Sequence, residues 1–114
     1  MRAILINPEN QTVTEVKYNN NYKEIYELIG CNTFCCPVDF ENGDTMYADD
    51  EGNFKIQKGG IVMKNWYYPI LGKILILGTG NDGESIDAKS DCQELAAQIT
   101  WLTEEEVHDY QSKF

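Results

Sequence analysis

The chain opens with two short β-prone runs and then a helical repeat of apolar positions. Arg2–Asn7 and Thr12–Lys17 flank residues 8–11, which have turn composition, so the three segments predict a β-hairpin. Gly30 predicts the end of a helix that follows the hairpin. Four large side chains spaced i, i+3, i+4 and i+7 form the predicted apolar face of that helix: Tyr22, Ile25, Tyr26 and Ile29.

The middle of the chain alternates short apolar runs with turn signals. Residues 33–40 are rich in β-branched, aromatic and cysteine side chains, and Pro37 among them predicts an edge strand or a bulge, because proline cannot donate to a central ladder. Residues 42–44 predict the turn of a hairpin that continues into Thr45–Tyr47. The polar turn 49–53 and a glycine pair at 59–60 then separate short strands or extended loops at 54–56 and 61–63.

The last third holds the most apolar segment and two helix starts. Residues 70–77 predict a strand, and the unbroken run Ile74–Leu77 predicts a central place in the sheet, covered on both faces. Asp91 predicts the cap of a helix that packs on the sheet. The apolar face of this helix repeats at helical spacing: Cys92, Leu95, Ala96 and Ile99.

The closing segment predicts a third helix. Thr103 with Glu106 has the spacing of a capping box, while Leu102 and Val107 occupy the two positions of a hydrophobic staple. Val107, Tyr110 and Phe114 then share one helical face. Together the elements predict one α+β domain over residues 1–114, with an antiparallel or mixed sheet and about three helices packed against it.

Charge narrows the class of partner. Nine Lys and Arg against nineteen Asp and Glu give a net charge of −10 that is spread along the chain. Such a field repels nucleic acid and anionic lipid, so we expect neither as a direct partner. The sequence shows no membrane span and no signal-peptide pattern, and we expect a cytoplasmic protein with reduced thiols at its four cysteines. Acidity that serves solubility alone is the simplest alternative.

The motifs that resemble catalytic or cofactor sites are incomplete. Gly78, Gly80 and Gly83 have dinucleotide-fingerprint spacing after an apolar strand, but the required helix is delayed and acidic residues occupy the phosphate position, so we expect a simple loop. The cysteines lack a C-x-x-C pair, and the single histidine, His108, lies far from them on a predicted exposed helical position. We therefore predict no cofactor, no metal and no enzyme activity.

Two sets of residues remain as binding candidates. The first is the acidic surface formed by Asp49, Asp50, Glu51, Glu104 and Glu105, which in one interpretation presents carboxylates to a partner. The second is an aromatic and glycine set that an alternative interpretation assigns to a nucleotide ligand, with backbone amides of the glycines as phosphate contacts: Trp66, Tyr67, Tyr68, Gly78 and Gly80.

Several segments carry a resemblance to a known family. They are Ile4–Glu9 with Glu15-Val16 and Ile29-Gly30, then Asp50–Gly52, residues 70–78, and residues 102–114. Together they resemble a family of small uncharacterised phage and mobile-element proteins, a domain of unknown function that often occurs near antirestriction genes. The resemblance spans most of the chain and supplies no catalytic residues. Cys35-Cys36, residues 66–68 and the helix around Leu95 depart from the family pattern.

The resemblance implies a role against bacterial defence, within an infected or carrier bacterial cell. The leading hypothesis is an acidic, non-enzymatic inhibitor that docks on the basic, nucleic-acid-handling surface of a host defence protein, such as a CRISPR or restriction component. One alternative is a sponge that sequesters a nucleotide immune signal in an aromatic pocket, including one at a homo-oligomer interface. A second alternative is a small structural or regulatory protein.

Overall fold

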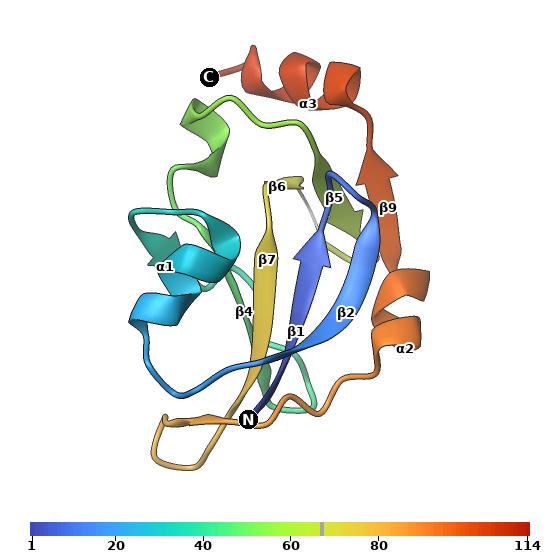
Figure 1. Ribbon diagram of the computed structural model, residues 1–114. Helices are drawn as coiled ribbons and strands as arrows, with labels where there is room; N and C mark the ends of the chain where they lie inside the picture. Colours follow the sequence, from blue (N-terminus) through green and yellow to red (C-terminus); the bar gives the residue numbers. More distant parts are fainter. Residues whose placement is uncertain (67) are drawn as a thin grey trace.

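Strand β7 organises the molecule, because it is the one strand that pairs with three others among the residues that the structure describes, 1–66 and 68–114. The computed structural model has two antiparallel sheets and three α-helices (Figure 1). The larger sheet contains β1 (Arg2–Asn7), β2 (Thr12–Lys17), β3 (Phe34–Cys35), β4 (Asp44–Asp49), β7 (Ile74–Thr79) and β8 (Ser85–Ile86). The smaller contains β5 (Gly60–Met63), β6 (Ile70–Leu71) and β9 (Ile99–Leu102). The helices are α1 (Lys23–Ile29), α2 (Cys92–Ala97), α3 (Glu104–Gln111) and the short 3₁₀ helix η1 (Gly52–Phe54).

The strand order explains the apolar run in β7. The larger sheet has the order β2-β1-β7-β4-β3, with β8 also pairing with β7, so β7 is central as predicted. Leu75 and Leu77 face α1 and pack in one cluster with Ile25 and Ile29. Residues on the opposite face of the strand pack against the smaller sheet and α2. Both faces of β7 are therefore covered, which is why its sequence does not alternate.

Most of the predicted elements are confirmed. The β1–β2 hairpin has the predicted bounds, with a register from Arg2 opposite Lys17 to Asn7 opposite Thr12. Gly30 ends α1 in the left-handed region, at φ 67°. The short β3 lies at the sheet edge, as Pro37 predicted. The α+β class with helices packed on antiparallel sheets is also confirmed.

Two predicted elements are divided differently in the structure. Residues 70–77 do not form one strand, because Gly72 adopts φ 86° and turns the chain from β6 in the smaller sheet to β7 in the larger. Ile99 does not continue α2, which ends at Ala97. Instead Ile99 pairs with Met63 in the smaller sheet and packs against the core. In both places tertiary pairing overrides the local pattern.

Two aromatic residues predicted on helix faces are more exposed than expected. Tyr22 precedes α1 and is 59% exposed, although its ring still contacts Tyr26 edge-on. Phe114 lies beyond the end of α3 and is 61% exposed. The segment 54–56, predicted as a short strand or loop, is the end of η1 followed by loop.

A buried carboxylate joins the larger sheet to the segment before α2. Asp44, at the start of β4, is 1% exposed. Its oxygens accept hydrogen bonds from the backbone N–H groups of Lys89 and Ser90 and from the Ser90 hydroxyl at 2.6 Å. Asn42 donates to the same hydroxyl at 3.0 Å. The sequence suggested only a turn here, because the partners lie more than forty positions away.

Candidate functional site

The candidate site is the end of the molecule built around α3, which we call the α3 end and define as residues 49–58, 68–71 and 103–114. The helix begins where the capping box predicts: the Thr103 hydroxyl accepts from the Glu106 N–H, and the Glu106 carboxylate accepts from the Thr103 N–H, both at 3.1 Å. Val107 is fully buried beneath the helix. These contacts orient α3 over the ends of the sheets, at the top of Figure 1.

Gln111 fastens the last turn of α3 to the loop around η1. Its side-chain amide donates to the backbone carbonyls of Gly52 at 3.3 Å and Lys55 at 2.5 Å. The Phe114 ring adds a contact on the same side, with its centroid 6.0 Å from that of Phe54. Two segments far apart in sequence are thus held together at this end of the molecule.

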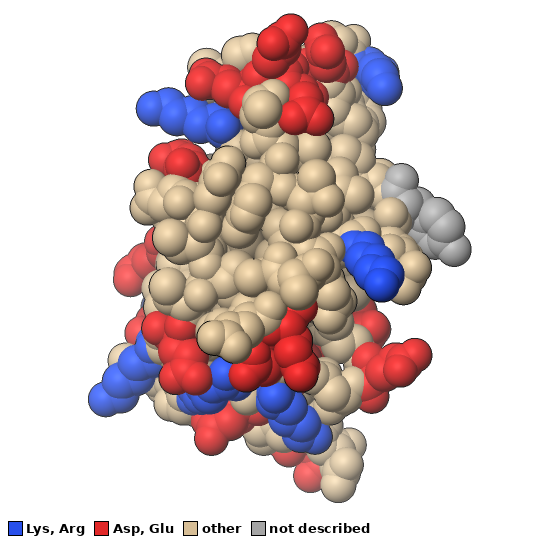
Figure 2. All heavy atoms as spheres, turned by 90° about the vertical axis from the view of Figure 1, so that its right-hand side faces the viewer, with Lys and Arg blue, Asp and Glu red and all other residues tan. Residues whose placement is uncertain are grey.

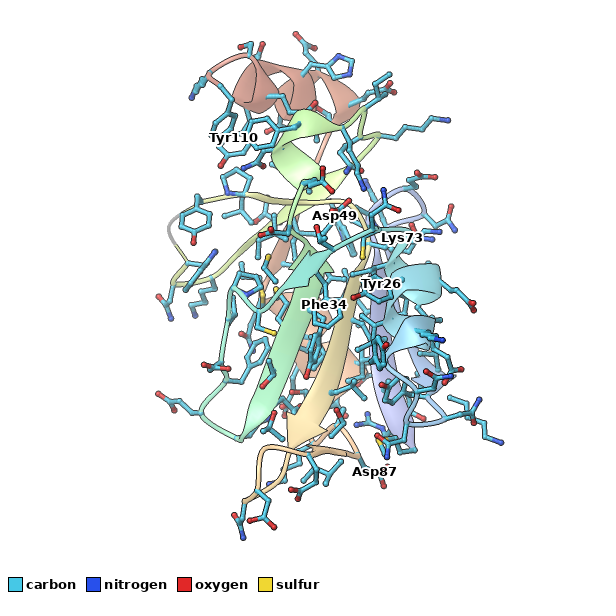
Figure 3. The ribbon with its side chains drawn as sticks, turned by 90° about the vertical axis from the view of Figure 1, so that its left-hand side faces the viewer. Tyr26, Phe34, Asp49, Lys73, Asp87 and Tyr110 are labelled. Atoms are coloured by element: carbon cyan, nitrogen blue, oxygen red, sulfur yellow. The ribbon has the colours of Figure 1, made fainter. Side chains whose placement is uncertain are left out.

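Asp49 is a structural residue, which corrects its assignment to the exposed acidic surface. Its side chain is 4% exposed and forms a 2.8 Å ion pair with Lys55. It also accepts a hydrogen bond from the Glu51 N–H at 2.9 Å. The hydrogen bond to Asp49 raises the pKa of Lys55. Asp49 therefore stabilises the loop and is not presented to a partner. Figure 3 shows it beneath η1, at the same end as Tyr110.

The other four carboxylates of the predicted acidic surface are exposed at the α3 end. Asp50 and Glu51 follow β4, while Glu104 and Glu105 lie in the first turn of α3. Within the described residues, Glu104 and Glu105 make no hydrogen bond or ion pair through their carboxylates. Figure 2 shows acidic side chains gathered over α3, with a largely uncharged belt below them. Acidic groups in a first turn also favour the helix dipole.

Several carboxylates at the opposite end of the molecule are engaged in the fold. Asp87, labelled there in Figure 3, accepts from the Arg2 N–H at 2.8 Å. Glu15 pairs with the Arg2 guanidinium at 2.6 Å. Asp91 caps α2, as predicted, by accepting from two of its first N–H groups. Other carboxylates of that end, such as Asp82 in the β7–β8 hairpin, are exposed, so exposed carboxylates are not confined to the α3 end.

Tyr68 borders two hollows at the α3 end. It is 47% exposed. One hollow of about 210 Å³ runs from Tyr68 past Asp49 and Asp50, and the other, of about 450 Å³, runs past Tyr110 and Lys113. Trp66 is half-buried against the core, with its ring 5.3 Å from that of Tyr68. Tyr67 lies outside the described residues.

The structure does not bring the two glycines of the alternative ligand set to these aromatics. Gly78 and Gly80 lie at the far end of β7, in the hairpin with β8. The length of β7, about 3.3 Å per residue, separates them from the segment that carries Tyr68. The Gly80 N–H donates to the Glu84 carbonyl at 2.8 Å. The glycine-rich segment is thus the turn of the β7–β8 hairpin, which agrees with the loop predicted from the sequence.

The four thiols are free and their pKa values are raised. Burial is the main cause for Cys31, Cys35, Cys36 and Cys92, and nearby carboxylates such as Asp50 beside Cys35 add to it. A raised pKa keeps a thiol in its weakly nucleophilic protonated form. His108 is exposed on α3, as predicted. Among the described residues, no group of three or more His, Cys, Asp or Glu side chains is arranged to hold a metal ion.

Sequence reasoning overlooked the apolar residues of the α3 end. Phe54 and Ile56 are 77% and 93% exposed and line a hollow of about 350 Å³ together with His108 and Phe114. The only signal was a pair of large apolar residues flanking Lys55 in a segment rich in Gly, Asn and Lys. That pattern does not distinguish a strand from an exposed loop.

The fold and this surface define a small α+β domain with an acidic, aromatic end. The chain belongs to a family described as a domain of unknown function, DUF3846, whose model matches residues 1–104. The resemblance to an uncharacterised domain family is therefore confirmed. No curated protein and no solved structure matches the chain. None of the described helices has the length and apolar character needed to cross a membrane.

Proposed function

We propose that this protein is a non-enzymatic inhibitor that uses its α3 end to bind a basic, nucleic-acid-handling surface of a partner protein. The observation that carries the proposal is the convergence of Asp50, Glu51, Glu104 and Glu105 with exposed aromatic side chains at one end of a protein of net charge −10. Interfaces of proteins commonly combine aromatic anchors with a charged rim.

Electrostatics favours this class of partner. Residues 49–58 and 103–114 contain seven carboxylates and three lysines, a net charge of −4, and one of those lysines is already paired with Asp49. Carboxylates that occupy the place of phosphates on a basic cleft speed association, and the attraction weakens as salt screens it. Direct binding of nucleic acid by the same surface is opposed by the same charge.

The resemblance to phage and mobile-element proteins motivates the biological setting. In this proposal the partner is a host defence protein, such as a CRISPR or restriction component, and the inhibitor blocks its nucleic-acid site. The alternative nucleotide sponge receives less support, since the exposed Asp50 lines the hollow beside Tyr68 and repels phosphate groups. The separation of Gly80 from Tyr68 also removes the amide contacts on which that alternative relied.

The test is a pull-down with tagged protein from bacterial lysates that carry diverse defence systems, washed at low and high salt and analysed by mass spectrometry. The test variant is Asp50→Asn/Glu51→Gln/Glu104→Gln/Glu105→Gln. We expect wild type to retain a nucleic-acid-handling protein at low salt and lose it at high salt, and the variant to lose it at both. Removal of the two helical charges costs about 0.3–1 kcal/mol of stability each, so thermal melting should confirm that the variant is folded.

The matched control neutralises four exposed carboxylates elsewhere on the surface: Glu27→Gln/Glu41→Gln/Asp82→Asn/Glu94→Gln. Test and control variants then have the same net charge of about −6. Equal loss of the partner with both variants would show that total charge decides binding and would overturn the α3 end as the site. A partner that survives high salt, or a co-purified nucleotide without a protein, would overturn the electrostatic inhibitor.

A further inference from the structure

The α3 end carries an exposed apolar patch, which we define as Phe54, Ile56 and Phe114. These side chains are 77%, 93% and 61% exposed and line one shallow hollow of about 350 Å³. The Phe54 and Phe114 rings meet at 6.0 Å and the Phe114 and Tyr110 rings at 5.1 Å, so the patch is continuous with a row of aromatics. Single exposed apolar residues are ordinary on a protein surface, but a contiguous group over a hollow marks a contact site.

The patch is held in place by contacts beneath it. Gln111 donates to the carbonyls of Gly52 and Lys55 on either side of Phe54, and the part-buried ion pair between Asp49 and Lys55 anchors the same loop. The capping box fixes the other wall by setting where α3 begins. Ring pairs and backbone bonds of this kind reduce the entropy lost when a partner covers the surface.

The net negative charge of the two segments that form the patch favours a positively charged partner segment. The exposed acidic residues Glu51, Glu105 and Asp109 belong to the two segments that form the patch, residues 49–58 and 103–114, whose net charge is −4. The charged side chain that lines the hollow itself is Lys55, which is already paired with Asp49. A second copy docked symmetrically through this end would oppose −4 with −4. A segment that places apolar side chains on the patch and Lys or Arg on its rim satisfies both features.

We infer that the patch is the anchor site for a basic amphipathic segment of the partner protein. The patch accepts the apolar side of that segment, while exposed carboxylates of residues 49–58 and 103–114 attract its cations. The inference rests on the proposed function and adds that recognition is not by charge alone. Phe54 and Ile56 belong to the residues matched by the family model, whereas Phe114 lies beyond residue 104.

The experiment titrates the protein with fluorescent 14-residue peptides of Lys and Leu. One peptide places its leucines on one helical face, and the other has the same composition in scrambled order. We expect the amphipathic peptide to bind at least tenfold more tightly by fluorescence anisotropy. We also expect its amide shift changes in ¹⁵N NMR spectra to fall on residues 53–56 and 108–114. Equal binding of the two peptides, or shift changes at the opposite end, would overturn the inference.

The variant Phe54→Ala/Ile56→Ala tests the patch itself. Both side chains are largely exposed, so the fold should persist, with an unchanged melting temperature as the check. We expect at least a tenfold loss of binding to the amphipathic peptide. The control is Tyr22→Ala, which removes another exposed aromatic with a single edge-on ring contact at 6.2 Å and should leave binding unchanged. Retention of binding by the double variant would refute the assignment.

Two outcomes separate this inference from the proposed function. If the captured partner is lost with the neutralised carboxylates but retained by Phe54→Ala/Ile56→Ala, the patch inference fails and the inhibitor stands. If the double variant loses the peptide but no basic protein is captured by wild type, the inhibitor fails while the patch remains a site for basic amphipathic segments. Sedimentation gives a further check. If wild type is a dimer and the double variant is a monomer, a second copy covers the patch, and the inference is overturned.

Discussion

The two regions that strand β9 connects differ in how far their apolar side chains are buried. Ile99, at its start, joins a core that also includes Ile76 of β7, which is fully buried. Beyond Leu102, the α3 end is held by a capping box, the buried Val107 and polar contacts of Gln111 and Asp49, and it leaves Phe54 and Ile56 in solvent. Burial of apolar area supplies most of the stability of a domain, whereas exposed apolar groups add little to it. The comparison indicates that stability resides around β7, whereas the exposed apolar side chains of the α3 end are the ones to which we assign binding in the proposed function.

The largest expected effect comes from a cavity in the core. Ile76→Ala should lower the free energy of unfolding by about 3–4 kcal/mol, because it removes buried methyl groups and leaves a void beneath the smaller sheet. Phe54→Ala should change it by less than about 0.5 kcal/mol. Urea denaturation of both variants checks the contrast. If the two variants lost similar amounts of unfolding free energy, Phe54 would contribute to stability as much as a core residue does. The contrast between the core and the α3 end would then be wrong.

A second large effect is expected at the buried carboxylate of β4. Asp44→Ala should cost about 3 kcal/mol, because the N–H groups of Lys89 and Ser90 lose a charged acceptor in a buried place. The matched change Asp82→Ala, at an exposed hairpin position, should leave the urea midpoint unchanged. If the Asp44 variant kept wild-type stability, the link between β4 and the segment before α2 would be dispensable.

A smaller effect, confined to the α3 end, is expected at the helix cap. Thr103→Ala should cost about 1 kcal/mol by removing the hydroxyl that accepts from the Glu106 N–H. Amide hydrogen exchange should accelerate in α3 and stay unchanged in β7, while Thr103→Ser should restore protection. Faster exchange throughout the molecule would mean that α3 and the core unfold as one unit. The α3 end would then not be a separate, less stable region.

The smallest and most gradual effect is expected from alkaline pH. Burial raises the pKa of Cys31 and Tyr18 above their ordinary values of 9.0 and 10.0. The unfolded chain therefore loses these protons at lower pH than the folded one, so the stability they contribute is present below about pH 8.5 and declines above it. Urea midpoints measured from pH 7 to pH 10 should fall steadily, and a midpoint that rises would contradict the shifts.

The sequence predicted local elements well wherever local chemistry decides them. The β1–β2 hairpin, the Gly30 stop, the Asp91 cap and the Thr103 capping box depend on residues a few positions apart, and all were confirmed. The division of residues 70–77 into two strands was missed, because only the two sheets determine where the chain must turn at Gly72.

The candidate site was predicted in part. Four acidic residues of the α3 end were named from the sequence, because charge is visible there without any fold. Asp49 was placed with them wrongly, since its burial depends on Lys55 folding back over it. Phe54 and Ile56 were not recognised, because an apolar residue is expected in a core until the structure shows that nothing in the described chain covers it.

By itself the sequence determined the α+β class, the caps and turns, the central place of β7 and the net charge of −10, because each depends on composition or on near neighbours. Only the tertiary structure decided which carboxylates are exposed, which one is buried against Ser90, and that Phe54 meets Phe114. The Asp44–Ser90 and Phe54–Phe114 contacts join residues 46 and 60 positions apart, which the sheets and α3 bring together. The burial of Asp49 depends on how its loop folds to place Lys55 beside it.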